Sequence, residues 1–341
     1  MMRAAVFEGT GKPLAIRDIA IPEPGAGELL IRVHRCGVCG SDLHMTDVHS
    51  CFNPAEGSVI GHEIAGDVVA LGAGAEASWR EGDRIAVLPF IGCGTCLPCL
   101  SGNPTQCGNG RSQASGGAIG GFAEYCLASG RDSVRLSDQL SWEEGAFVEP
   151  LAVGVHTMAM ATIPVGARVL VLGAGPVGLA VAASARLCGA DTIVVAARSD
   201  RRADLAITMG ASDFLIADER LGENFAKRAG GQPEVIIECV GSPGMMDLAA
   251  GVAAARATIV MAGACMQVEP FMPIQATMKE LIYKFAVAYS RRDFAFAEKL
   301  IASGRINPMP MFEGTVSMAD FPAQFEALRT NKLACKIMLQ P

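Results

Sequence analysis

Four closely spaced cysteines could bind a metal ion: Cys93, Cys96, Cys99 and Cys107. Two residues separate each of the first three, and seven separate the third from the fourth. Cysteines at every third position cannot all face the core of one helix or strand, but a loop wrapped around an ion brings them together. Four thiolates close a tetrahedral zinc site and leave no position for chemistry, so we predict a structural zinc. Free or disulfide-bonded cysteines and an iron–sulfur cluster are the alternatives.

A second group of metal-binding residue types lies earlier in the chain, at Cys39, His62 and Glu63. One thiolate, one imidazole and one carboxylate leave a fourth position open for water or substrate, which is typical of catalytic zinc. Cys36 and Cys39 also form a Cys-x-x-Cys pair, the pattern of a redox-active dithiol. The later His-Glu pair favours the metal site instead and leaves Cys36 as a small buried residue.

Two further side chains could move a proton at this site. Ser41 and His44 are three residues apart, so on one helical turn they share a face. A hydroxyl in this position could accept the proton of an alcohol, and the imidazole could release it to solvent. His34 and His49 have no such neighbours, and we expect them to be surface or packing residues.

A glycine-rich segment follows the apolar run Arg168–Leu172 and precedes an apolar helical segment, Leu179–Cys188. In this strand-to-helix context, Gly-x-Gly-x-x-Gly predicts a dinucleotide site. The first glycine makes the tight turn, and the second lets the backbone approach the pyrophosphate, which then lies on the helix N-terminus. The predicted contacts are Gly173, Gly175, Pro176, Val177 and Gly178.

The residues after the next predicted strand, Thr192–Ala197, favour NADP over NAD. An acidic residue about twenty positions after the glycines normally binds the ribose 2′-hydroxyl of NAD, and Ala197 occupies that position. Arg198, Ser199 and Arg202 follow, and they suit a 2′-phosphate because Arg offers charge and a bidentate donor fork. A solvated helix start is the alternative interpretation of these basic residues.

The elements that must position these groups fall into two patterns. Loose alternation over Met2–Ile19 and the apolar strands Leu29–Val33 and Ile64–Leu71 predict a β-rich, barrel-like domain over residues 1–150, with the cysteine lobe at 92–108. Strands alternating with helices over residues 151–288 predict a doubly wound parallel sheet. Residues 289–341 are expected to return to the first domain, which makes an α/β protein.

Composition excludes several classes of function. The 341 residues suffice for two cores, and the net charge of −7 argues against a nucleic-acid surface. Met1–Phe7 does not read as a signal peptide, and glycines or prolines interrupt the two long uncharged runs, so we expect no membrane association. Twelve cysteines without an export signal indicate a reducing compartment, and we expect the protein to be cytoplasmic.

Taken together, these motifs resemble the zinc-dependent medium-chain dehydrogenases, the alcohol and polyol dehydrogenase family. The resemblance covers the whole chain through five ordered motifs: Cys39-Gly-Ser-Asp-Leu-His44, Gly61-His-Glu63, the cysteine lobe, Glu149-Pro-Leu, and the glycine loop. It implies a GroES-like catalytic domain, a Rossmann domain, and a homodimer or homotetramer. It also implies that Asp42 supports His62. Glu149 stands where alcohol dehydrogenases carry a second cysteine ligand, which resembles the polyol branch, so either Glu63 or Glu149 could bind the catalytic zinc.

The resemblance implies reversible hydride transfer between NAD(P) and a small-molecule alcohol or polyol, with one catalytic and one structural zinc. Ser41 would accept the substrate proton and pass it through the nicotinamide ribose hydroxyl to His44. Two alternatives remain at this point: a non-catalytic binding protein that keeps zinc, and a zinc-independent enoyl or quinone reductase of the same fold.

Overall fold

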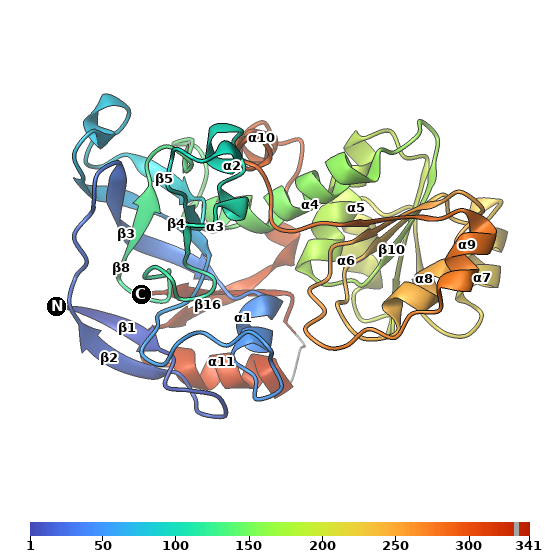
Figure 1. Cartoon of the computed structure of the whole chain (residues 1–341), viewed down its shortest axis with the longest axis horizontal. Helices are drawn as coiled ribbons and strands as arrows, with labels where there is room; N and C mark the ends of the chain where they lie inside the picture. Colours follow the sequence, from blue (N-terminus) through green and yellow to red (C-terminus); the bar gives the residue numbers. More distant parts are fainter. Residues whose placement is uncertain (331–333) are drawn as a thin grey trace. The chain divides into compact units, whose positions relative to one another are not determined.

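The chain forms two compact units in a computed structural model, which describes residues 1–330 and 334–341. Unit 1 comprises Met1–Ala152 and Tyr289–Pro341, and unit 2 comprises Val153–Ala288 (Figure 1). Within the described residues, no helix combines the length and the apolar character needed to cross a bilayer.

Unit 1 is built on a seven-stranded sheet in the order β16-β17-β3-β4-β5-β9, with β8 paired to β3. Its strands are β3 (Glu28–Gly37), β4 (Glu63–Leu71), β5 (Arg84–Val87), β8 (Tyr125–Ser129), β9 (Val134–Arg135), β16 (Phe312–Ser317) and β17 (Lys336–Gln340). Two antiparallel pairs lie outside this sheet: β1 (Met2–Val6) with β2 (Ala15–Ile19), and β6 (Phe90–Ile91) with β7 (Arg111–Ser112). Alternate residues of β3, such as Ile31 and Val33, point into a core that also holds Phe122, Phe321 and Phe325.

Short helices connect and flank the strands of unit 1. They are α1 (Gly40–Met45), η1 (Ala75–Ala77), α2 (Leu97–Leu100), η2 (Pro104–Gln106), α3 (Trp142–Ala146), α10 (Arg291–Ala302), η3 (Met309–Met311) and α11 (Phe321–Thr330). α4 (Val148–Ala161) begins in unit 1 and ends in unit 2. Ser141 and Ser290 cap α3 and α10, each accepting a hydrogen bond from a backbone N–H of the first turn.

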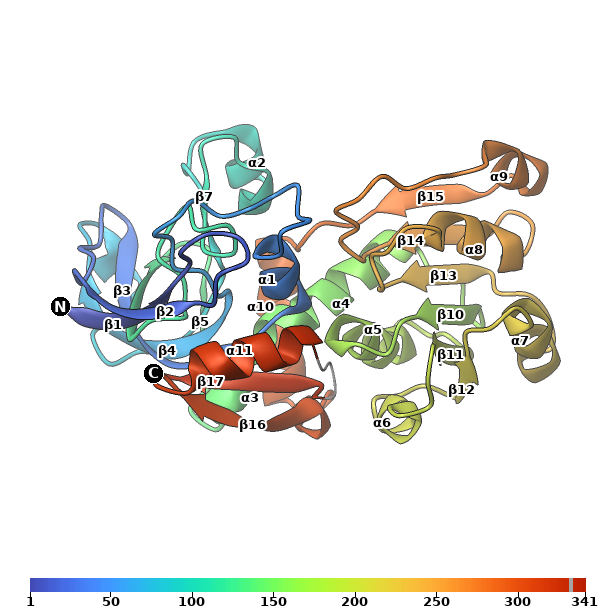
Figure 2. The same cartoon turned by 90° about the horizontal axis from the view of Figure 1, so that it is seen from below.

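Unit 2 contains six parallel strands in the order β12-β11-β10-β13-β14-β15 (Figure 2). They are β10 (Arg168–Leu172), β11 (Thr192–Ala197), β12 (Asp213–Ile216), β13 (Val235–Glu238), β14 (Thr258–Met261) and β15 (Ile282–Phe285). The helices are α5 (Pro176–Leu187), α6 (Ala203–Thr208), α7 (Leu221–Ala229), α8 (Met245–Val252) and α9 (Pro273–Lys279). The strand order reverses between β10 and β13, which is the topological switch point where ligands bind in such sheets.

The predicted doubly wound parallel sheet is therefore confirmed, with one local correction. The helix after the glycine loop begins at Pro176 rather than Leu179, because proline suits the first helical turn. The last strand of the sheet, β15, ends at Phe285. Ala288 then adopts a positive φ of 48°, which breaks the extended conformation.

Candidate catalytic site

Cys39, His62 and Glu63 lie together where β3 ends and β4 begins. Cys39 is the N-cap residue of α1, and Glu63 pairs with Gly37 across the two strands. A side chain at Gly37 would have its Cβ 1.9 Å from Glu63 Oε2, so only glycine leaves room for this carboxylate. The ligand atoms of Cys39, His62 and Glu63 all lie within 4.8 Å of one another, which fits a single metal ion.

Asp42 orders this group from the first turn of α1. Its Oδ2 accepts a hydrogen bond from the Cys39 backbone N–H at 2.9 Å. Its Oδ1 lies 3.1 Å from His62 Nδ1, close enough for an ion pair although the two atoms are not aligned as a hydrogen bond. Burial alone would lower the pKa of His62, but Asp42 and Cys39 outweigh it and raise that pKa well above its usual range. The same negative surroundings favour a divalent cation.

A buried lysine that the sequence analysis missed holds Glu63. Lys336 on β17 donates to Glu63 Oε1 at 2.6 Å and to the carbonyl of Val38 at 2.9 Å. Both charged side chains are 1% exposed. Glu63 Oε2 is buried and has no hydrogen-bond partner among the described residues. A carboxylate with one oxygen held by lysine and the other without a hydrogen bond fits the third protein ligand of a catalytic zinc, beside Cys39 and His62.

Glu149 lies in the first turn of α4 but outside the cluster of three ligand atoms. Its Oε1 accepts a hydrogen bond at 2.8 Å from the hydroxyl of Tyr289, a buried residue 140 positions later. Burial raises the pKa of Glu149 to about 7, with His62 and Tyr289 opposing the rise and Glu63 adding to it. Glu149 is therefore within the electrostatic reach of the cluster, and the tyrosine sets its orientation.

The proposed relay residues lie on α1 beside the cluster. The Oγ of Ser41 is 3.4 Å from His62 Nε2, and His44 is exposed one turn later. Cys36 is fully buried, and burial raises the pKa of its thiol well above the usual range, so its predicted packing role is confirmed. His34 is also a packing residue, stacked on Trp142 with ring centroids 4.2 Å apart.

The four lobe cysteines converge as their spacing predicts. Their Sγ atoms lie within 4.8 Å of one another, and those of Cys96 and Cys107 are 3.7 Å apart. Zn–S bonds of about 2.3 Å in a tetrahedron would place sulfurs about 3.8 Å apart, so the group fits zinc. Backbone hydrogen bonds from Thr95 and Cys96 lower the pKa of Cys93 to about 5. These donors stabilise thiolate, the form that binds a metal.

The glycine loop opens α5 at the carboxyl end of β10. Gly173 has a φ of +108°, and a Cβ at Gly178 would lie 1.9 Å from the Gly173 carbonyl oxygen. Both positions therefore require glycine. Gly175 is the N-cap residue, and Pro176 with Val177 begins the first turn. The N–H groups of this turn are available to an anion.

The basic residues predicted to bind the cofactor lie beside this loop. Ala197 ends β11, and Arg198 and Ser199 follow it as exposed residues. Arg202 donates from Nη1 to the carbonyl of Ala174 at 3.0 Å, which attaches it to the glycine loop itself.

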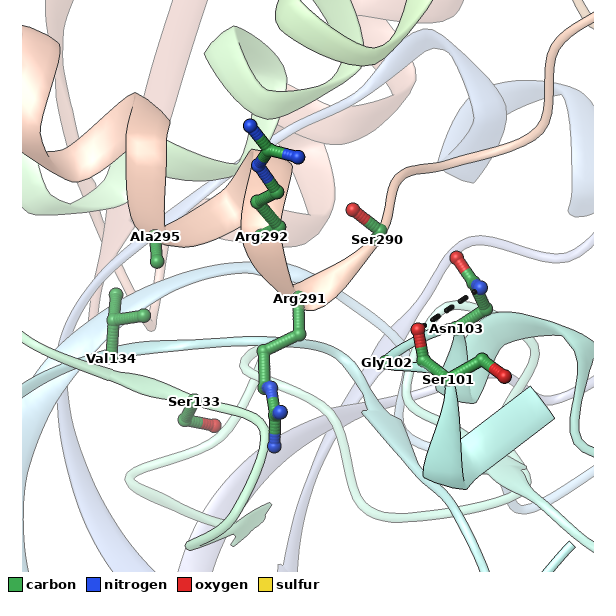
Figure 3. Close-up of a pocket in the computed structure, with 9 residues that line it drawn as sticks. All are labelled: Ser101, Gly102, Asn103, Ser133, Val134, Ser290, Arg291, Arg292 and Ala295. Carbon is green, nitrogen blue, oxygen red and sulfur yellow. Dashed lines mark hydrogen bonds between the residues drawn. The ribbon is translucent and has the colours of Figure 1, made fainter. Parts of the chain in front are cut away.

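A cavity of about 470 Å³ lies elsewhere in unit 1, next to the cysteine lobe (Figure 3). The side chain of Arg291 extends between Ser133 and Ser101, whereas Arg292 points the opposite way. The start of α10 is already capped, because the carboxylate of Asp293 accepts from the backbone N–H of Ser290. The cavity contains none of the predicted site residues.

Comparison with known proteins places the chain in a family. Residues 25–138 match the alcohol dehydrogenase GroES-like domain, and residues 176–303 match the zinc-binding dehydrogenase domain. A sorbitol dehydrogenase from Bombyx mori is 36% identical over 245 residues, 70% of each chain. The structure of the alcohol dehydrogenase rspB from E. coli CFT073, complexed with NADH, aligns with a TM-score of 0.89 at 28% identity, covering 100% of this chain and 99% of the other. A zinc-binding dehydrogenase from Sinorhizobium meliloti 1021, bound to NADP, aligns with a TM-score of 0.88 at 29% identity, covering 100% of this chain and 99% of the other.

The chain belongs to the zinc-dependent alcohol and polyol dehydrogenase family, and it is an oxidoreductase. The expected GroES-like domain and Rossmann sheet are confirmed. The expected function, zinc-dependent hydride transfer between an alcohol or polyol and a nicotinamide cofactor, is confirmed at the level of the family. This disfavours both alternatives, the non-catalytic protein and the zinc-independent reductase.

Proposed function

We propose that the enzyme interconverts a secondary alcohol of a polyol or diol with its ketone, and that NADP(H) is its preferred cofactor. The observation that carries the proposal is the convergence of Cys39, His62 and Glu63, a set with a carboxylate in place of a second cysteine. The sorbitol dehydrogenase relative supports the polyol class. When bound, zinc would polarise the substrate oxygen and the nicotinamide would accept the hydride.

The residues of unit 1 then take distinct roles in this proposal. Cys39, His62 and Glu63 hold the catalytic ion, with Lys336 compensating the charge of one Glu63 oxygen. Asp42 keeps the His62 ring oriented, as outer-shell carboxylates do in metal sites. Glu149, which accepts a hydrogen bond from Tyr289, lies outside the Cys39, His62 and Glu63 group and is not a ligand of the catalytic zinc in the resting enzyme.

Ser41 and His44 are the proposed proton relay. Ser41 is partly buried beside His62, so its hydroxyl can accept the substrate proton. His44 is exposed one turn later, so its imidazole can exchange that proton with solvent. The four lobe cysteines hold a second, structural zinc with no open position.

A panel of substrates tests the proposed class. We expect kcat/KM for sorbitol, xylitol or 2,3-butanediol to exceed that for ethanol and benzyl alcohol by at least tenfold. A preference for primary alcohols over all polyols and diols would contradict the proposal.

The NADP preference depends on the turn after β11. Ala197 offers no carboxylate to repel a 2′-phosphate, and Arg198 offers an exposed guanidinium. We expect the parent to favour NADP(H) and the double variant Ala197→Asp/Arg198→Leu to lower the ratio of kcat/KM values for NADP and NAD at least tenfold. Arg201→Leu, an exposed neighbour, is the matched control and should leave the ratio within twofold. A parent that favours NAD, or an unchanged ratio in the double variant, would contradict this assignment.

We also propose a homodimer or homotetramer that operates in the cytoplasm. β15 is the edge strand of the unit 2 sheet; its last residue, Phe285, is 65% exposed, and Met278 of the preceding helix α9 is 78% exposed. An exposed apolar edge strand is a surface that a second copy could cover. Light scattering after gel filtration should give two or four chains, and a monomer would contradict the proposal. No disulfide joins any of the twelve cysteines, all of which lie within the described residues, and this supports a reducing compartment.

A further inference from the structure

Glu238 is a buried carboxylate at the carboxyl end of β13 that the roles above do not use. Its side chain is completely buried. Oε1 accepts hydrogen bonds from the backbone N–H groups of Val240, at 2.5 Å, and Gly241, at 2.9 Å. Oε2 is buried without a hydrogen-bond partner among the described residues. Burial also raises the pKa of this carboxyl above its usual range. The two hydrogen bonds to Oε1 offset only part of the free-energy cost of burying this carboxyl group.

Glu238 is hydrogen-bonded to two neighbouring turns, to one through its side chain and to the other through its backbone. Its side chain fixes the turn that follows β13, while its backbone carbonyl accepts from the N–H groups of Ala262 and Gly263, both at 2.8 Å, in the turn that follows β14. A Cβ at Gly263 would lie 2.3 Å from the backbone nitrogen of Gly241 and 2.6 Å from Glu238 Oε2. The two turns therefore pack at backbone distance, with the carboxylate between them.

The same turns adjoin the glycine loop. The Cys239 backbone N–H donates to the carbonyl of Leu172 at 2.9 Å, and a Cβ at Gly173 would lie 3.1 Å from a methyl carbon of Val240. β10 and β13 flank the topological switch point, and a dinucleotide lies across the carboxyl ends of the strands there. With the pyrophosphate at the glycine loop, the nicotinamide half extends toward β13 and β14. The side chain of Val240 is 42% exposed at this edge and offers apolar surface to a ring.

We propose that Glu238 is a positioning residue for the nicotinamide half of the cofactor. It holds the turns after β13 and β14 in one conformation, so that the exposed edge around Val240 is preformed when the cofactor binds. A preformed edge lowers the ordering cost of binding. The proposal rests on the use of a nicotinamide cofactor and is independent of the identity of the alcohol.

The test compares the whole cofactor with a fragment that lacks nicotinamide. Fluorescence titration gives the dissociation constant of NADPH, and competition gives that of 2′-phospho-ADP-ribose, both without substrate. Glu238→Ala should weaken NADPH binding about tenfold and change fragment binding less than twofold. Glu238→Gln should retain binding within about threefold, because an amide oxygen can still accept from both N–H groups. If the alanine variant does not fold, Glu238→Asp, whose carboxylate cannot reach both amides, takes its place with the same expected shift.

Glu234 provides the matched control, because it accepts from the backbone N–H of Arg168 at the opposite end of the same strands. Glu234→Ala should leave both dissociation constants within twofold. Unchanged NADPH binding in Glu238→Ala, or in Glu238→Asp where it is used instead, would overturn the proposal. Equal weakening of cofactor and fragment would also overturn it, because that result would indicate a structural role alone. A parent that binds NADH but not NADPH would contradict only the NADP preference, and NADH with ADP-ribose would then replace the two ligands. A parent that binds neither NADPH nor NADH would contradict cofactor use itself, and this proposal with it.

Discussion

The ion pair between Lys336 and Glu63 gives a strong prediction because both partners are buried. Their atoms are 2.6 Å apart and each side chain is 1% exposed. Burial alone would lower the pKa of Lys336, but Glu63 outweighs it and raises that pKa, so the lysine is charged at neutral pH. In protein freed of metal, Lys336→Met keeps the volume but leaves the buried Glu63 carboxylate without a compensating cation. Removing one partner of a buried pair costs about 3–5 kcal/mol.

Tryptophan fluorescence measures the loss of unfolding free energy in unit 1. The only two tryptophans in the sequence, Trp79 and Trp142, both belong to unit 1. Urea denaturation of Lys336→Met should lower the free energy of unfolding of unit 1 by about 3–5 kcal/mol. The thermal midpoint should fall by roughly 10 °C for a unit of this size.

Two further variants separate the buried pair from a general effect of losing a lysine. Lys227 pairs with Glu223 on the surface, with side chains 63% and 51% exposed, so Lys227→Met should cost less than about 1 kcal/mol. Glu63→Gln combined with Lys336→Met removes both charges and should recover most of the lost stability. The reasoning fails if Lys336→Met costs no more than Lys227→Met, or if the double variant is no more stable than Lys336→Met.

Two more predictions follow from the lobe and from the proposed relay. Cys96→Ser should lose one zinc per chain and lower the thermal midpoint of unit 1, because a closed zinc site contributes folding free energy directly. Metal analysis and calorimetry on one sample measure the zinc content and the midpoint. An unchanged midpoint after zinc loss would be inconsistent with a structural role. His44→Ala should slow turnover roughly ten- to a hundredfold, mainly at lower pH, where water replaces the imidazole least well. A pH–rate profile identical to that of the parent would exclude His44 from the relay.

The parts of the site that the sequence predicts are those whose spacing is local. The cysteine lobe lies within one loop, and the glycine loop lies within one strand-to-helix turn, so residue spacing alone constrains their geometry. The strand-to-helix context also predicts the parallel sheet, because regular alternation leaves few topologies. His62 and Glu63 are adjacent, and their distance from Cys39 is spanned by one connection between paired strands.

The parts that the sequence does not predict depend on contacts between distant segments. Lys336 reaches Glu63 from a strand 273 positions later, and Tyr289 reaches Glu149 from 140 positions later. No local pattern encodes such packing. A single lysine within the apolar run of β17 was the only available signal, since a buried charge requires a partner. The sequence motifs also left the carboxylate ligand open between Glu63 and Glu149, and only the three-dimensional grouping favours Glu63.

The most direct test of the central claim measures zinc content and turnover together in the parent and in Cys39→Ala. The parent should carry two zinc ions per chain and reduce NAD(P) in the presence of a polyol or diol. Cys39→Ala should keep one zinc, retain the thermal midpoint of the parent, and lose at least about a thousandfold in kcat/KM, since the Lewis acid supplies several kcal/mol of charge stabilisation. A Cys39→Ala protein with one zinc and near-parental turnover would contradict the account.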